Sequence, residues 1–292
     1  MQPPLELSHH TDLDNYRRAV DAYLRTDLGG LNHLYTTVHN ASPDMLLQRQ
    51  SWLARLHCDG RTCGLALINS SLPLRSLVIT DVDAEGARLI AQALAQAGIF
   101  PTDVTGPRDS VGALIAAMRP VPYTRLRAEL GNHLLDTPPV VPACPGSWRA
   151  ACVEDRDLLC QWERAFMVEC GFPVIGDQIR DIVEQRLASP TTLYRLWEVD
   201  GAPAAMAMGK LLPPTARIGP VYTTPAFRGR GCAGSLVAHL GRELMTGGAS
   251  AVSLFTDLAN PVSNGVYRRI GFRLIGELIH FDVESSDPGC TI

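Results

Sequence analysis

Residues 228–234 read RGRGCAG, and this stretch is the strongest indication of fold in the chain. Gly229, Gly231 and Gly234 satisfy the pattern G-x-G-x-x-G, in which small residues let a phosphate approach the backbone closely. A strand-like run, TARIGPVYT, precedes the stretch, and a helix-like run, SLVAHLGREL, follows it. The loop is therefore expected to bind the phosphates of a nucleotide-containing ligand.

A nicotinamide dinucleotide is one such ligand, but three features argue against it. In a dinucleotide-binding fold the strand runs directly into the first glycine, whereas TPAFR separates Thr223 from Gly229 here. The chain after Gly234 is too short for the further strand–helix units of a doubly wound sheet. Arg228 and Arg230 add positive charge that suits a densely phosphorylated ligand. A nicotinamide-dependent oxidoreductase is therefore kept only as the weaker alternative.

Taken from Arg228, the same stretch is R-x-x-G-x-A at the start of a helix, where successive backbone amides bind anions. The string IGPVYTTPAFRGRGCAGSLVAHL, followed by LFTDLANPVSNGVYRRIGF, resembles the GCN5-related N-acetyltransferase (GNAT) superfamily. That superfamily has a loop of pattern R/Q-x-x-G-x-G/A, and the wider string is similar to its FR47-like branch. The resemblance covers about residues 217–272. It implies an acetyl-CoA-dependent N-acetyltransferase.

The two halves of the chain have a similar order of expected elements, which predicts an α/β protein with two GNAT folds in tandem, each a mixed sheet with helices. The proline-rich stretch LLDTPPVVPACPG, at 134–146, marks the boundary. Residues 1–138 would form a degenerate GNAT-like domain, because DVDAEGA stands where a glycine loop would be needed. Residues 139–292 would form the catalytic domain with the cofactor site. Two unrelated α/β modules are the alternative.

Helices and strands follow from periodicity and from turn residues. Helices are expected at 14–25, 83–97, 109–118, 155–169, 177–188, directly after Gly231, and at 261–270. Strands are expected at 51–58, 63–69, 76–80, 102–106, 124–130, 192–199, 202–212, 216–223, 250–257 and 272–283.

The GNAT resemblance assigns the cofactor-binding residues. Pantetheine would pair like an added strand with the backbone of Val221, Tyr222 and Thr223. Asn260 and Asn264 would contact the pantetheine or the nearby main chain. The pyrophosphate would lie on the main-chain amides of the loop residues Arg228, Gly229, Arg230, Gly231, Cys232, Ala233 and Gly234.

The helix expected at 261–270 has its own chemistry. Asn260 suits a helix N-cap, and Gly271 suits the position that ends the helix. At about 100° per residue, Val262, Val266 and Ile270 share one face and would pack on the sheet. The face with Asn260, Asn264 and Tyr267 would lie elsewhere. The resemblance implies that Tyr267 is the acid that protonates the departing thiolate; composition alone suggests a packing role.

The sequence does not assign the general base to one residue. Relatives in the superfamily use a glutamate near the acceptor end of the fourth strand, or ordered water. The corresponding run ARIGPVYT contains no carboxylate. Glu169 and Glu198 are the candidates on neighbouring elements, with water as the third possibility.

Composition limits the partners. A net charge of −4 argues against nucleic acid as the main partner. No apolar run approaches the roughly 20 residues of a membrane helix, and no signal peptide is evident, so a cytoplasmic protein is expected. The cysteines form no C-x-x-C pair and the histidines no ligand spacing, so no metal is expected. The acceptor would be a small-molecule or peptide amine, and the chain a monomer or homodimer. The other reading is a non-catalytic acyl-CoA-binding regulatory protein.

Overall fold

The computed structural model describes residues 3–41, 51–68, 75–120, 123–172, 176 and 178–284. The fold divides into two compact units. Unit 1 consists of Met1–Gly131, Asp257–Ala259 and Gly276–Ile292. Unit 2 consists of Asn132–Thr256 and Asn260–Ile275.

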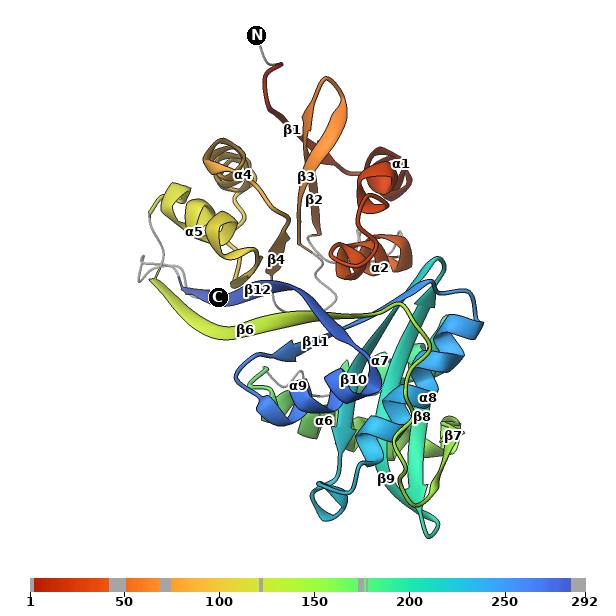
Figure 1. Ribbon diagram of the computed structural model, residues 1–292. Helices are drawn as coiled ribbons and strands as arrows, with labels where there is room; N and C mark the ends of the chain where they lie inside the picture. Colours follow the sequence, from red (N-terminus) through yellow and green to blue (C-terminus); the bar gives the residue numbers. More distant parts are fainter. Residues whose placement is uncertain are drawn as a thin grey trace. The chain divides into compact units, whose positions relative to one another are not determined.

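The elements of the first half of the sequence alternate between strands and helices in a fixed order (Figure 1). They are β1 (Glu6–His10), α1 (Leu13–Leu24), α2 (Asn32–Asn40), β2 (Trp52–Cys58), β3 (Arg61–Ile68), β4 (Ser76–Ile79), α4 (Ala84–Gln96), β5 (Asp103–Gly106), α5 (Arg108–Ala117) and β6 (Tyr123–Leu135). The helices and strands expected in this half are confirmed; β1 and α2 were not foreseen.

The second half repeats this order. Its elements are β7 (Ser147–Ala150), α6 (Arg156–Glu169), α7 (Gln178–Ala188), β8 (Thr192–Val199), β9 (Ala202–Leu212), β10 (Thr215–Thr223), α8 (Cys232–Thr246), β11 (Ala251–Asp257), α9 (Pro261–Ile270) and β12 (Arg273–Glu284). Short 3₁₀ turns lie at Val153–Asp155 and Pro225–Phe227. Among the described residues, both halves therefore have the order β-α-α-β-β-β-α-β-α-β. This matched order is the tandem arrangement that the sequence predicts.

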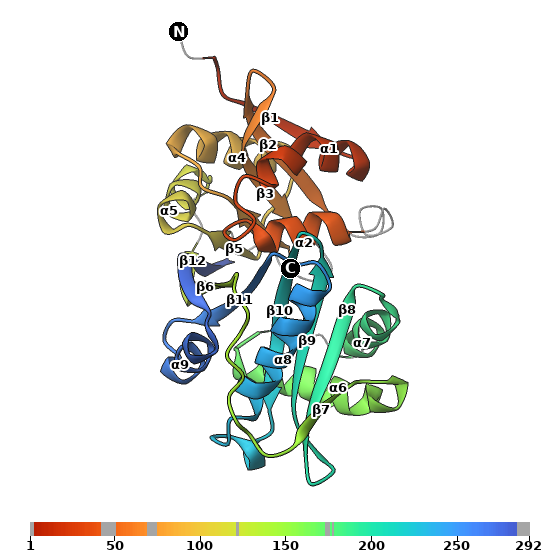
Figure 2. The same ribbon diagram turned by 45° about the vertical axis from the view of Figure 1, so that its right-hand side comes forward.

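In unit 2 the strands lie in the order β6-β11-β10-β9-β8-β7, with helices on both faces. Helix α8 covers one face of β8, β9 and β10, whereas α6 and α7 lie on the other face (Figure 1; Figure 2). The core under α8 includes Leu236, Leu240 and Val252. The core under α6 and α7 includes Trp162 and Met206. Unit 2 is thus a three-layer structure with one mixed sheet in the middle.

In unit 1 the strand next to β5 is β12, the last strand of the sequence. Ile279 pairs antiparallel with Gly106, and Asp282 pairs with Asp103. Ile279 and Val283 are buried in the core of unit 1. In unit 2, the place next to β11 is taken by the end of β6. Each unit therefore contains a part of the terminal strand of the other half of the sequence. The domain ranges 1–138 and 139–292, with their different functions, remain a prediction.

Candidate functional site

The glycine loop leaves the end of β10 through the turn Pro225–Phe227 and enters α8. Gly229 and Gly231 have φ angles of 72° and 86°, in the left-handed region that favours glycine. Gly231 is the N-cap of α8, and no side chain caps this helix. The first-turn amides of Cys232, Ala233 and Gly234 have no partner within an α-helix. Such an uncapped N-terminus can bind an anion.

The two arginines of the loop are held by different partners. The Arg228 Nη2 atom lies 2.5 Å from Glu169 Oε1, and its Nε donates to the Thr223 carbonyl at 3.1 Å. The Glu169 carboxylate raises the pKa of Arg228. The Arg230 guanidinium lies 5.2 Å from the centre of the Phe227 ring. Both guanidinium groups are therefore held by contacts outside α8.

The proline-rich segment that precedes β7 supports the loop. The Cys144 Sγ lies 3.2 Å from the Arg230 carbonyl and 3.6 Å from the Cys232 Sγ. The Ser235 hydroxyl donates to the Pro142 carbonyl at 2.8 Å. Burial raises the pKa of Cys232 to about 11, so its thiol stays neutral. These contacts agree with a packing role for the Cys232 side chain.

Strand β10 has an edge on which another extended chain can pair. On one side, Val221, Tyr222 and Thr223 pair antiparallel with β9. On the other side, the parallel pairing with β11 covers Thr215 to Arg217 and ends there within the described part of the chain. A β-bulge follows, between Ile218 and Val221. The backbone at 221–223 is therefore next to a fork between two strands.

Helix α9 begins and ends as the sequence predicts. The Asn260 Oδ1 accepts from the Ser263 amide at 3.1 Å, and Gly271 ends the helix with a φ of 117°. The expected packing face is wrong in two respects. Ile270 is buried, but Val262 is 73% exposed, because the first turn of α9 is not covered by the core of unit 2. Tyr267, expected on a different face, lies in the same core as Ile270.

Asn264 and Tyr267, on α9, both contact other parts of unit 2. The Thr256 hydroxyl donates to Asn264 Oδ1 and lies 3.0 Å from His133 Nε2. Asn264 is thus held in a polar contact with β11 and β6. Tyr267 is buried and packs edge-on against Phe272, with ring centres 5.9 Å apart. Burial raises the pKa of Tyr267, so the hydroxyl keeps its proton at neutral pH.

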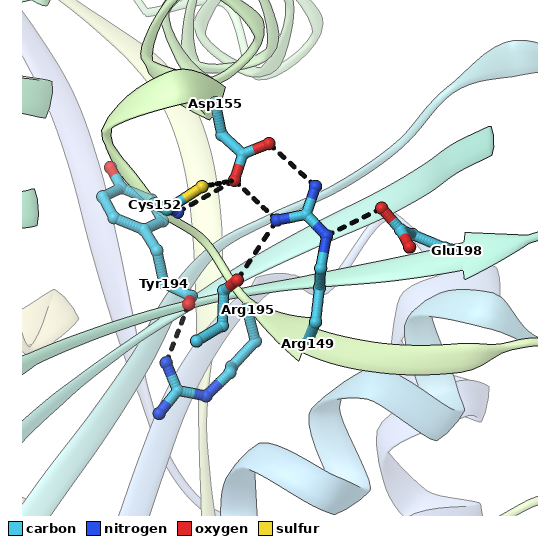
Figure 3. Close-up of polar contacts among 7 residues, drawn as sticks. Arg149, Cys152, Asp155, Tyr194, Arg195 and Glu198 are labelled. Carbon is cyan, nitrogen blue, oxygen red and sulfur yellow. Dashed lines mark hydrogen bonds and ion pairs between the residues drawn. The ribbon is translucent and has the colours of Figure 1, made fainter. Parts of the chain in front are cut away.

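Glu198, one of the two candidate bases, is engaged in a network on β7 and β8 (Figure 3). Its Oε1 accepts from Arg149 Nε at 2.7 Å. Both terminal nitrogens of Arg149 donate to Asp155, at 2.6 and 2.8 Å. This guanidinium lowers the pKa of Asp155 to about 2. Glu169, the other candidate, pairs with Arg228. Each carboxylate therefore already neutralises an arginine.

The corresponding helix end in unit 1 is closed. Helix α4 follows β4 as α8 follows β10, but its N-cap is Asp83. The Asp83 Oδ1 accepts from the Gly86 amide at 2.8 Å. A carboxylate thus occupies the position where an anion would bind, and its charge repels phosphate.

The described residues contain no helix long and apolar enough to cross a membrane. Within the same ranges, no three His, Cys, Asp or Glu side chains lie close enough together to hold a metal ion.

The strand β10 belongs to a mixed sheet and pairs antiparallel with β9. The fold therefore differs from the parallel sheet of a dinucleotide-binding domain.

These features define a fold class: a mixed sheet in which two parallel strands separate beside the uncapped N-terminus of a helix. Residues 156–272 match the model of the acetyltransferase (GNAT) family. The family match thus falls within the second half of the sequence, and the whole chain has the fold of a solved tandem GNAT protein.

Solved structures match the chain over both units. A Drosophila protein is 13% identical, with a TM-score of 0.67, and the match covers 96% of this chain and 98% of that one. A tandem GNAT protein from the clavulanic acid biosynthesis pathway is 16% identical, with a TM-score of 0.60 and coverages of 98% and 100%. A GCN5-related N-acetyltransferase from Sphaerobacter thermophilus is 17% identical, with a TM-score of 0.59 and coverages of 100% and 99%. At these identities the likeness concerns the fold. No curated protein matches the sequence.

Proposed function

We propose that the protein is an N-acetyltransferase that uses acetyl-CoA and that unit 2 carries the reaction. The observation that carries the proposal is the unpaired edge of β10 beside the uncapped N-terminus of α8. Pantetheine fits that edge as an added strand along Val221, Tyr222 and Thr223. The amides of the loop from Arg228 to Gly234 would hold the pyrophosphate.

The residues of unit 2 have distinct roles in this proposal. Acetyl-CoA supplies the thioester that an amine attacks directly. Tyr267 would hold the proton that the thiolate takes as it leaves, since its buried hydroxyl stays protonated. Asn260 and Asn264 would shape the pantetheine side of α9, through the helix cap and the contact with Thr256.

The test is thiol release from acetyl-CoA in the presence of a panel of amines. The panel includes amino acids, polyamines, aminoglycosides and lysine-containing peptides. Thiol release that depends on an amine supports the proposal. Tight coenzyme A binding with no thiol release on any amine would instead identify an acyl-CoA-binding regulatory protein.

Glu198→Gln is expected to keep kcat within about twofold of the unchanged protein. The reason is that Glu198 neutralises Arg149 and so lacks a free carboxylate for proton transfer. Loss of a general base lowers the rate by about 10²- to 10⁴-fold. The measurement is kcat for thiol release with the best amine of the panel, with the melting temperature as a check on folding. A loss of that size in a folded variant would assign the base to Glu198.

The chain is expected to bind one coenzyme A, in unit 2. Asp83 already caps the equivalent helix end in unit 1, where its carboxylate takes the Gly86 amide and would repel a pyrophosphate. Isothermal titration calorimetry gives the stoichiometry directly. Two equivalents per chain would contradict the assignment of unit 1 as a domain without a cofactor site.

A further inference from the structure

The sheet face under α6 and α7 carries more positive than negative charge. Glu163, on α6, is buried and accepts from the Tyr194 hydroxyl at 2.5 Å. Arg186, on α7, donates to the same carboxylate oxygen at 2.7 Å. The charges of Glu163 and Arg186 thus neutralise each other. The charge of Lys210, on β9, is not neutralised in this way. Its ammonium group donates at 3.1 to 3.2 Å to the hydroxyls of Ser189 and Thr192, which carry no charge.

Arg217, on β10, lies next to Lys210. The two residues are directly opposite in the β9–β10 pairing, so their side chains share a face of the sheet. The neighbours of Arg217 along β10, Ala216 and Ile218, belong to the core under α8. The Arg217 side chain therefore points to the α6 and α7 side. No described carboxylate forms an ion pair with it, and burial and the nearby Arg186 lower its pKa.

Ser253, on β11, completes the group. It is the parallel partner of Arg217, and its side chain is 1% exposed. The Ser253 hydroxyl has no hydrogen-bond partner among the described residues. Buried polar groups normally have hydrogen-bond partners, and Arg217 beside Ser253 is only partly exposed. An unpaired hydroxyl beside an unpaired guanidinium is the pattern expected of a site whose anion comes from outside the chain.

The position of this group within the sheet points to the acceptor. Arg217 and Ser253 are the last paired residues of β10 and β11, where the fork between these strands begins. Val221, the first residue proposed to contact pantetheine, follows four positions later. Four residues of strand span about 13 Å, and the bulge between Ile218 and Val221 shortens this path. A small molecule at the fork can therefore reach both the guanidinium and the thioester.

We infer that Arg217, with Lys210 and Ser253, binds a carboxylate of the acceptor, so that the acceptor is an amine of the amino-acid class. This inference rests on the proposed function of unit 2. It disfavours polyamines and aminoglycosides, because their charge would be repelled by two neighbouring cations.

The experiment compares leucine, glutamate and lysine with their C-terminal amides as acceptors in thiol release. The unchanged protein is expected to show kcat/KM at least about tenfold higher for the acids, the size of a charge-assisted hydrogen bond. Arg217→Met should bring the ratio of acid to amide close to one. Arg217→Lys keeps the charge and should retain part of the preference.

Two further variants separate a binding role from a folding defect. Ser253→Ala removes a hydroxyl that has no partner, and it should lower the ratio of acid to amide by about threefold. Arg195→Met is the matched control. Arg195 is also a sheet arginine, but it faces α8 and pairs with Glu243, so the ratio should not change. Coenzyme A affinity and circular dichroism verify that each variant is folded.

The outcomes are distinguishable. A ratio near one in the unchanged protein, or an unchanged preference in folded Arg217→Met, overturns the carboxylate site while the acetyltransferase proposal stands. If no amine releases thiol, the acetyltransferase proposal fails, and calorimetry of leucine and glutamate with the coenzyme A-loaded chain decides the inference. Binding that Arg217→Met weakens at least about tenfold supports it; binding that is absent or equal in both overturns it.

Discussion

Gly231→Glu is expected to weaken coenzyme A binding by at least about 100-fold while the chain still folds. The new carboxylate would lie at the N-terminus of α8, as Asp83 does in α4. It would compete for the helix amides and repel the pyrophosphate. There is room for the side chain, since a Cβ at Gly231 would meet no atom closer than 3.9 Å.

The backbone of Gly231 requires a matched control. Its φ of 86° strains any other residue, at a cost of about 1 to 3 kcal/mol. Gly231→Gln has the same strain and nearly the same size but no charge, so the difference between the two variants isolates the charge. Calorimetry with coenzyme A gives both affinities. If Gly231→Glu binds coenzyme A as tightly as the unchanged protein, the loop is not the pyrophosphate site.

Tyr267→Phe is expected to lower kcat at least about tenfold and to leave the affinity for acetyl-CoA nearly unchanged. The substitution keeps the ring that packs against Phe272 and removes only the hydroxyl. A thiol of the cysteine type has a pKa of about 8.5. The coenzyme A thiolate therefore has to gain a proton as it leaves. Without the hydroxyl, that proton has to come from water.

The matched control for this variant is Tyr16→Phe. Tyr16 is fully buried in unit 1, and its hydroxyl donates to the Ala54 carbonyl at 3.4 Å. The chemical change is the same, but the residue has no proposed part in the reaction, so kcat should not fall. Steady-state kinetics and the melting temperature are measured for both. A wild-type kcat in folded Tyr267→Phe would return Tyr267 to a packing role.

Local signals made most of the elements predictable from the sequence. Helix α9 has both a side-chain cap at Asn260 and a terminal glycine at Gly271, so its bounds were clear. Helix α2 was missed because it has no side-chain cap and contains β-branched residues that favour strands. Strands β1 and β7 were missed because they are short and only partly buried, and so lack a clear alternation.

The site was harder to predict from the sequence than the helices and strands, because its contacts join residues that are far apart in the sequence. The loop from Arg228 to Gly234 could be singled out from the spacing of its glycines and arginines. The Glu163–Tyr194 hydrogen bond and the neighbouring positions of Arg217 and Ser253 depend on strand register and helix packing. No spacing in the sequence encodes them. The exposure of Val262 was missed for the same reason, since helical periodicity does not say how far the core extends along a helix.

The position of β12 beside β5 has a consequence for how the chain is made. During synthesis, β5 leaves the ribosome long before β12, since all the elements from β6 to α9 come between them. Domains made early usually fold as units while the rest is still being translated. Unit 1 cannot do so, because the strand that pairs with β5 and supplies Ile279 and Val283 to its core arrives last. The edge of β5 therefore stays unpaired in the nascent chain. An unpaired strand edge can pair wrongly with another strand unless a chaperone covers it.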